Sequence, residues 1–167
     1  MSEQRLYNVL FLCTGNSARS VLAESYLNAN AGDRFLSHSA GSHPKGAVHP
    51  LTLDTLRIAR LPTAGLRSKS WDEFARGDAP KMDFIITVCD SAAGEVCPVW
   101  PGQPMTAHWS FADPAAFDGR EVEQRAFFLE VFRQIRNRLD LFRNLPIARL
   151  SRLALKQELD DIGRTPA

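Results

Sequence analysis

A cysteine and an arginine six positions apart, Cys13 and Arg19, enclose a loop of small and amide side chains. Residues 7–12 before this loop read as a buried strand, and residues 21–27 after it have helical spacing. A helix N-terminus offers unpaired N–H groups and a positive dipole end, which together bind tetrahedral oxyanions. The same field stabilises a thiolate, and an arginine fork matches two anionic oxygens. We therefore predict that Cys13 is a nucleophile of lowered pKa, facing a bound oxyanion.

The loop itself is predicted to cradle the anion. A short backbone curled around one anion aims successive N–H groups inward. Gly15 and Asn16 are residues that accept positive φ, which such a curl requires. The predicted oxyanion-binding residues are Thr14, Gly15, Asn16, Ser17, Ala18, Arg19 and Ser20.

Two further thiols and an acid follow later strands. Cys89 ends the β-branched run of residues 84–88, and Cys97 lies eight positions further on. Their spacing matches no zinc motif, which leaves a redox relay between thiols or a buried structural role for Cys89. Asp113 precedes a proline that biases it toward extended backbone. It either manages a proton during attack by Cys13 or merely caps a turn.

Strand-like and helix-like segments alternate along the whole chain. This order favours an α/β fold with a parallel, doubly wound sheet, which binds ligands at the carboxyl ends of its strands. Cys13, Cys89 and Asp113 all follow predicted strands, so we expect them at one edge. The expected strands span residues 7–12, 34–40, 84–88 and 105–109, and the expected helices lie after residue 20, after residue 50, near 70–74, over 120–145 and from 146 to 159.

Composition narrows the class of protein. The chain has 167 residues and a net charge of +1, which fits one domain over residues 1–167 without affinity for nucleic acid or a membrane surface. No apolar run approaches the roughly 18 residues of a membrane span, and the N-terminus lacks a signal-peptide layout. Three cysteines are too few for a disulfide scaffold. We expect a cytoplasmic, monomeric enzyme that uses thiols chemically and holds no metal.

Residues 9–20, Val-Leu-Phe-Leu-Cys-Thr-Gly-Asn-Ser-Ala-Arg-Ser, resemble the arsenate reductases built on the low-molecular-weight tyrosine phosphatase fold. The resemblance extends through Ser39-Ala40-Gly41, the Cys89–Cys97 segment, His108-Trp109 and Asp113-Pro114-Ala115. It implies a three-layer αβα fold with a four-stranded parallel sheet.

The resemblance also implies a reaction and a partner. Cys13 would attack arsenate, Cys89 would attack the Cys13 sulfur to release arsenite, and Cys97 would carry the disulfide outward, with Asp113 managing the proton. Phosphate and sulfate would compete for the site. Thioredoxin is favoured over glutathione with glutaredoxin as the external reductant, and no bound cofactor is expected. Some members hold potassium near the loop, where Asn16 and Glu24 match part of the site; we do not predict the ion.

Two alternatives remain. A low-molecular-weight tyrosine phosphatase would hydrolyse phosphomonoesters through a Cys13 phosphoenzyme, without further thiols. Phosphatases of this fold resemble one another in an aromatic pair after Asp-Pro, where this chain has Ala115-Ala116, which favours a small inorganic oxyanion. A noncatalytic anion-binding module would need no reactive thiol, and a Cys13 pKa close to that of free cysteine would indicate it.

Overall fold

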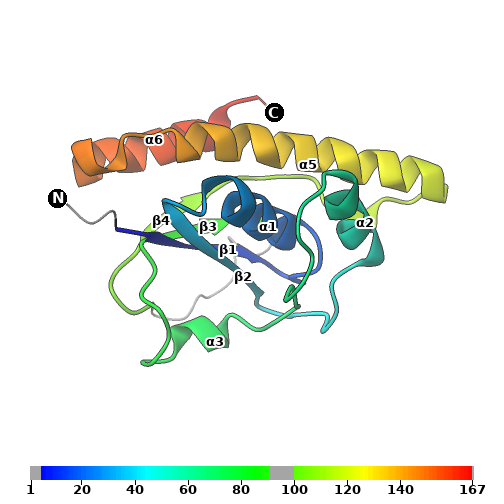
Figure 1. Ribbon diagram of the computed structural model, residues 1–167, viewed down its shortest axis with the longest axis horizontal. Coiled ribbons are helices and arrows are strands. Elements are labelled where there is room, and N and C mark those ends of the chain that lie inside the picture. The colour runs from blue at the N-terminus through cyan, green and yellow to red at the C-terminus, as the bar shows by residue number, and fades with distance from the viewer. Residues whose placement is uncertain (1–4, 91–99, 167) are drawn as a thin grey trace.

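A four-stranded parallel sheet forms the centre of the protein (Figure 1). The computed structural model describes residues 5–90 and 100–166. The strands are β1 (Tyr7–Cys13), β2 (Phe35–Gly41), β3 (Phe84–Thr87) and β4 (Met105–His108), in the order β2-β1-β3-β4. The helices are α1 (Arg19–Ala31), α2 (Pro50–Ile58), α3 (Asp72–Ala75), α5 (Glu121–Arg143) and α6 (Arg152–Arg164), with 3-10 turns at Pro114–Ala116 and Ile147–Arg149.

Helices cover the two faces of the sheet unequally. The long helix α5 runs across one face together with α1 and α6, whereas the short helix α3 lies on the opposite side (Figure 1). Alternate residues of a strand point to opposite faces, so Val9 and Phe11 join the larger core and Leu10 and Leu12 the smaller one. The predicted α/β fold with a four-stranded parallel sheet and flanking helices is confirmed.

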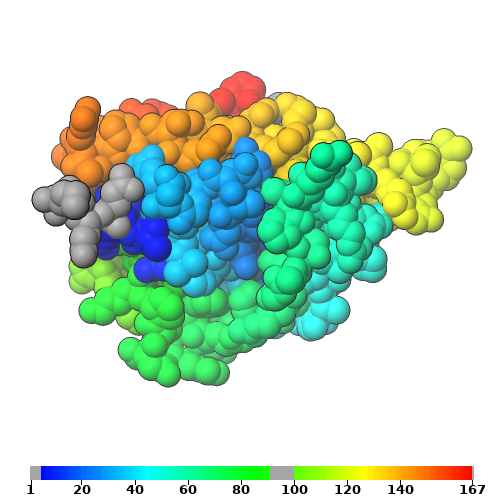
Figure 2. All heavy atoms as spheres, viewed as in Figure 1, coloured from blue at the N-terminus to red at the C-terminus, as the bar shows by residue number. Residues whose placement is uncertain are grey.

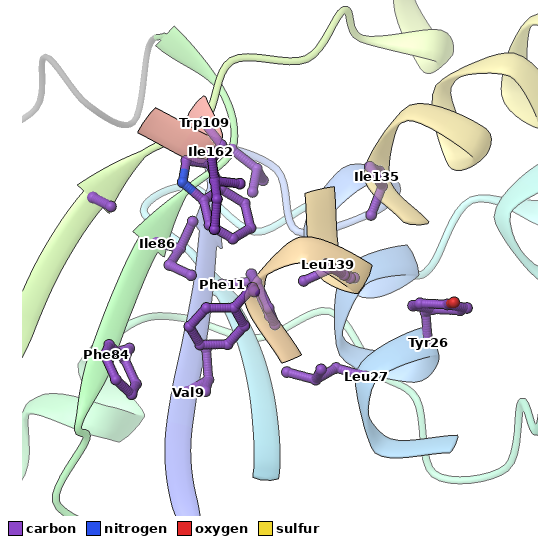
Figure 3. Close-up of a cluster of buried hydrophobic side chains, with 14 of the residues drawn as sticks. Val9, Phe11, Tyr26, Leu27, Phe84, Ile86, Trp109, Ile135, Leu139 and Ile162 are labelled. Carbon is purple, nitrogen blue, oxygen red and sulfur yellow. The ribbon is translucent and has the colours of Figure 1, made fainter. Parts of the chain in front are cut away.

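The larger core is closely packed and aromatic (Figure 3). Phe11 is fully buried and Trp109 is 1% exposed, and burying each such ring contributes about 2–3 kcal/mol. The indole N–H of Trp109 donates to the Leu159 carbonyl of α6 over 3.0 Å. This contact fixes the chain just beyond β4 against the helical layer.

Strand register brings the carboxyl ends of the strands to one edge. Cys13 lies opposite Gly41 of β2, Leu12 lies opposite Thr87 of β3, and Thr87 lies opposite His108 of β4. The segments that follow these residues therefore leave the sheet side by side. This register explains why Cys13, Cys89 and Asp113, which were expected to meet, leave the sheet at the same edge.

The C-terminal part differs from the expected continuous helix over 146–159. Residues Ile147–Arg149 form a 3-10 turn, and α6 begins at Arg152 and continues to Arg164. The hydroxyl of Ser151 accepts a hydrogen bond from the Ala154 N–H, which satisfies a first-turn donor and starts the helix there.

Figure 2 shows the other end of the helical layer, where the first turns of α5 project beyond α2. Among the described helices, none combines the length and the apolar character that crossing a membrane requires.

Candidate active site

Cys13 is the last residue of β1, and it is 3% exposed to solvent. Its sulfur lies 2.9 Å from the Ser20 hydroxyl oxygen and accepts a hydrogen bond from the Asn16 N–H over 3.2 Å. Burial raises the pKa of Cys13, and these hydrogen bonds only partly oppose the rise. The sequence-based expectation of a lowered pKa is therefore not met, because desolvation of the enclosed sulfur outweighs the donors around it.

The loop after Cys13 turns its carbonyl groups outward. The N–H groups of His43, Lys45 and His49 donate to the carbonyls of Thr14, Gly15 and Ser17, respectively, over 2.9–3.0 Å. Because the N–H and C=O of a trans peptide point to opposite sides, this arrangement directs the loop N–H groups toward the pocket. Helix α1 has no side-chain N-cap at Ala18, so no capping side chain occupies its first N–H donors, of which the Ser20 N–H interacts with the Cys13 sulfur.

Asn16 holds the turn of the loop. It is fully buried and has a φ of 46°, in the left-handed region that asparagine tolerates better than most residues. Its side-chain amide donates to the Ser20 hydroxyl over 2.8 Å and accepts from the Lys69 N–H over 2.9 Å. Ser20 was predicted to bind the oxyanion, but it is fully buried behind the thiol and contacts Cys13 instead.

Arg19 and Asp113 face each other across the pocket. One terminal nitrogen of Arg19 donates to the Phe111 carbonyl over 2.9 Å, and the other lies 3.6 Å from an Asp113 carboxylate oxygen. The second Asp113 oxygen accepts from the Ala115 N–H over 3.0 Å. Asp113 thus caps a turn and also lines the pocket, and its part in proton transfer stays a prediction.

The pocket has a volume of about 260 Å³ and a charged mouth. Besides the loop and Asp113, it is lined by His43 and Lys45, to which the sequence assigned no role. The sequence signal that could have identified His43 and Lys45 was their position just after Gly41, at the carboxyl end of β2. The lining residues are Cys13, Thr14, Gly15, Asn16, Ser17, Ala18, Arg19, His43, Lys45 and Asp113.

A second thiol lies beside the first. Cys89 is 3% exposed, and its sulfur lies 3.6 Å from the hydroxyl oxygen of Thr14, the residue after Cys13. The two cysteines are close enough to interact electrostatically, and this interaction adds to the raised pKa of Cys13. Cys97 lies outside the described residues. Within residues 5–90 and 100–166, no group of His, Cys, Asp and Glu side chains is arranged to hold a metal ion.

Replacing Ser20 by alanine removes the side-chain hydrogen bond that lowers the pKa of Cys13. We expect a further rise in that pKa and about a fivefold slower alkylation of Cys13 by iodoacetamide near pH 7, the factor that one hydrogen bond represents. The measurement is the alkylation rate of the Cys13 peptide against pH. Ser25→Ala is the matched control, because this buried serine of α1 donates to the Pro62 carbonyl instead. Coincident curves for Ser20→Ala and wild type would show that the hydroxyl does not tune the thiol.

The site combines Cys13 at a strand end with Arg19 and Asp113, which line the same pocket. These features define a thiol-based, phosphatase-type oxyanion site. The family model of the low molecular weight phosphotyrosine protein phosphatases matches residues 8–153. The chain belongs to this family.

Within that family, similar curated relatives are arsenate reductases. The enzyme of Bacillus licheniformis is 36% identical over 142 residues, which cover 85% of this chain and 96% of the relative. The enzyme of Bacillus subtilis is 35% identical over 134 residues, which cover 80% and 93%, respectively.

Solved structures agree on the fold. An arsenate reductase in the phosphate-binding state superposes with a TM-score of 0.67 at 25% identity, covering 87% of this chain and all of that one. The arsenate reductase of Archaeoglobus fulgidus has a TM-score of 0.57 at 30% identity and covers 77% and 96%, respectively. A tyrosine phosphatase of Erwinia amylovora, 20% identical with a TM-score of 0.59 over 80% and 88%, shares the fold.

Proposed function

We propose that this protein reduces arsenate to arsenite, with an external thiol protein supplying the electrons. The observation that carries the proposal is the position of Cys89, whose buried sulfur lies beside the oxyanion loop that Cys13 begins. A hydrolytic phosphatase needs one nucleophilic cysteine, whereas a two-electron reduction needs a second thiol to close a disulfide. The arsenate reductases among the relatives support the same conclusion.

The first step is nucleophilic attack by Cys13 on bound arsenate. A sulfur–arsenic bond forms while an arsenic–oxygen bond breaks, and the departing hydroxide leaves as water with the proton of the thiol. Burial raises the pKa of Cys13, so the proposed step includes a route for the proton of the thiol. Asp113 and Arg19 both line the pocket, and we expect Asp113 to relay that proton and Arg19 to hold the oxygens of the anion.

The second step is an attack by Cys89 on the Cys13 sulfur. A disulfide forms between them, the sulfur–arsenic bond breaks, and its electron pair passes to arsenic, which goes from the +5 to the +3 state and leaves as arsenite. In the proposed third step, Cys97 attacks the Cys89 sulfur, forms a new disulfide and releases Cys13 as a thiolate. Thioredoxin then reduces the Cys89–Cys97 disulfide by thiol exchange.

Phosphomonoester hydrolysis is the second candidate activity. The loop binds phosphate and arsenate by the same N–H groups and the same arginine, so slow hydrolysis of a small aryl phosphate is compatible with the site. No Phe, Tyr or Trp side chain lines the pocket within the described residues, and Ala115 follows Asp113-Pro114 where a stacking ring would grip a phosphotyrosine. This lining favours the smaller inorganic anion.

Arsenite formation by the purified protein tests the proposal. Arsenate is supplied with thioredoxin and its reductase in one reaction, and with glutathione and glutaredoxin in another. We expect turnover with thioredoxin to exceed turnover with glutaredoxin at least tenfold. We further propose that the protein works as a monomer in the cytoplasm, where free thiols persist. Absence of arsenite with both reductants, beside rapid hydrolysis of an aryl phosphate, would favour the phosphatase.

Changing Cys97 to serine is expected to stop the relay one step early. The Cys13–Cys89 disulfide then has no resolving thiol, so it accumulates after one turnover, and multiple turnover with thioredoxin falls at least a hundredfold. Peptide mass mapping under nonreducing conditions detects the trapped disulfide, with wild-type protein as the control. In the reaction with glutathione and glutaredoxin, a glutathione adduct on Cys89 in its place would assign the enzyme to glutaredoxin. Unimpaired multiple turnover with thioredoxin would exclude Cys97 from the relay.

A further inference from the structure

A buried ion pair lies beside the oxyanion loop, outside the pocket lining. The ammonium of Lys69 lies 3.8 Å from a Glu24 carboxylate oxygen, and the two side chains are 8% and 15% exposed. The same carboxylate oxygen accepts a hydrogen bond from the Ser39 hydroxyl, and the ammonium also donates to the Arg67 carbonyl over 3.1 Å. The reaction steps above use neither charge.

Hydrogen bonds connect this pair to the catalytic sulfur. The backbone N–H of Lys69 donates to the Asn16 side-chain oxygen over 2.9 Å. The Asn16 amide donates to Ser20 over 2.8 Å, and the Ser20 oxygen lies 2.9 Å from the Cys13 sulfur. Three successive contacts therefore lead from residue 69 to the thiol, and they pass through Asn16, whose φ is positive.

The charges on the pair depend on each other. Burial raises the pKa of Glu24 and lowers the pKa of Lys69, whereas the attraction between the two groups opposes both shifts. A buried charge without its partner would draw in water or move toward solvent. Loss of either side chain's charge would therefore release the segment around residue 69 from α1.

We propose that Lys69 is a positioning residue, whose ammonium pairs with Glu24 and thereby fixes the backbone N–H that holds Asn16 and the oxyanion loop. Glu24 belongs to α1, which begins at Arg19, so the pair ties the helix that carries the arginine to the segment that supports the loop. The inference concerns the loop and its thiol, and it rests on the proposed function only for its effect on arsenate turnover.

The surroundings of Glu24 do not fit a resident metal cation. Related enzymes with potassium imply a cation near Asn16 and Glu24, but here the Lys69 ammonium lies against the carboxylate and would repel a second positive charge. The chain thus supplies its own cation at this position. Phosphate affinity is accordingly expected to be the same, within twofold, in potassium chloride and in choline chloride of equal ionic strength.

Three variants test the inference: Lys69→Met, Lys69→Arg and Glu24→Gln. The readouts are the alkylation rate of the Cys13 peptide against pH and the binding of inorganic phosphate by calorimetry, with thermal unfolding recorded for each variant. We expect Lys69→Met to slow alkylation near pH 7 about fivefold and to weaken phosphate binding by a similar factor, the size of one lost hydrogen bond. Lys69→Arg keeps the charge and is expected to stay within twofold of wild type.

Glu24→Gln separates positioning from net charge. If Lys69 acted only through its charge, removing the nearby carboxylate would favour the thiolate and speed alkylation, opposite to Lys69→Met. Positioning predicts that both variants slow alkylation and weaken phosphate binding. Opposite effects of the two variants, no effect of either, or a several-fold gain in wild-type affinity from potassium would each overturn the inference. Because no arsenate is used, failure of the proposed reductase activity would leave these results unchanged.

Discussion

Replacing Cys13 by serine is expected to abolish both arsenite formation and hydrolysis of a small aryl phosphate. A serine hydroxyl is far less nucleophilic than a thiol at neutral pH, and it forms no disulfide with Cys89. Loss of a catalytic nucleophile lowers turnover by about 10³-fold or more. Both activities must fail together, because both begin with attack by the same sulfur at the end of β1.

Phosphate binding by calorimetry serves as the control for Cys13→Ser. The loop N–H groups, Arg19 and Asn16 are unchanged in this variant, so phosphate affinity is expected to stay within about fivefold of wild type, the contribution of one hydrogen bond. The loss of a nucleophile is expected to be much larger than a hundredfold. If the variant kept more than about one hundredth of either activity, Cys13 would not be the nucleophile.

Replacing Cys89 by serine is expected to separate the two activities. Arsenate reduction falls by at least a thousandfold, because a hydroxyl cannot attack sulfur to form a disulfide and release arsenic as arsenite. Hydrolysis of a small aryl phosphate stays within about threefold, because Cys13, Arg19 and Asp113 keep their contacts. The Cys89 sulfur contacts the Thr14 hydroxyl of the loop, and the hydroxyl of a serine at position 89 is expected to keep a polar contact with the same group.

Initial rates of arsenite release and of aryl phosphate hydrolysis, measured on the same preparation, test Cys89→Ser. Cys89→Ala is the matched variant, since it lacks the thiol and also the hydroxyl contact with Thr14. Equal loss of reduction in both variants assigns the defect to the missing thiol. Reduction at the wild-type rate in either variant would exclude the relay, and equal loss of both activities would indicate a structural role for Cys89.

The sequence predicted the sheet and the meeting of the chemical groups because both depend on local patterns. Buried runs such as residues 84–88 are strongly apolar and β-branched, and parallel strands place their carboxyl ends at one edge. Cys13, Cys89 and Asp113 follow three of the predicted strands. Their convergence thus required only the strand positions, which the structure reproduces to within one or two residues.

Features that depend on long-range burial were not predictable in the same way. The direction of the Cys13 pKa shift depends on how deeply the folded chain encloses the sulfur, and the sequence does not encode that depth locally. Ser20 follows Arg19 in sequence, yet the first turn of α1 directs its hydroxyl to the thiol. Lys69 and Glu24 are far apart along the chain, so their pairing appears only after α1 packs beside β2 and Ser70 pairs with Gly41 at the end of that strand.

Single-turnover arsenite stoichiometry tests the central claim most directly. Fully reduced protein is mixed with arsenate in the absence of any external reductant, and arsenite and remaining thiols are counted after one turnover. The disulfide mechanism predicts one arsenite per protein molecule, the loss of two thiols, and a disulfide that joins Cys89 to Cys13 or to Cys97. Arsenite without loss of protein thiols, or no arsenite from protein that still hydrolyses an aryl phosphate, would contradict it.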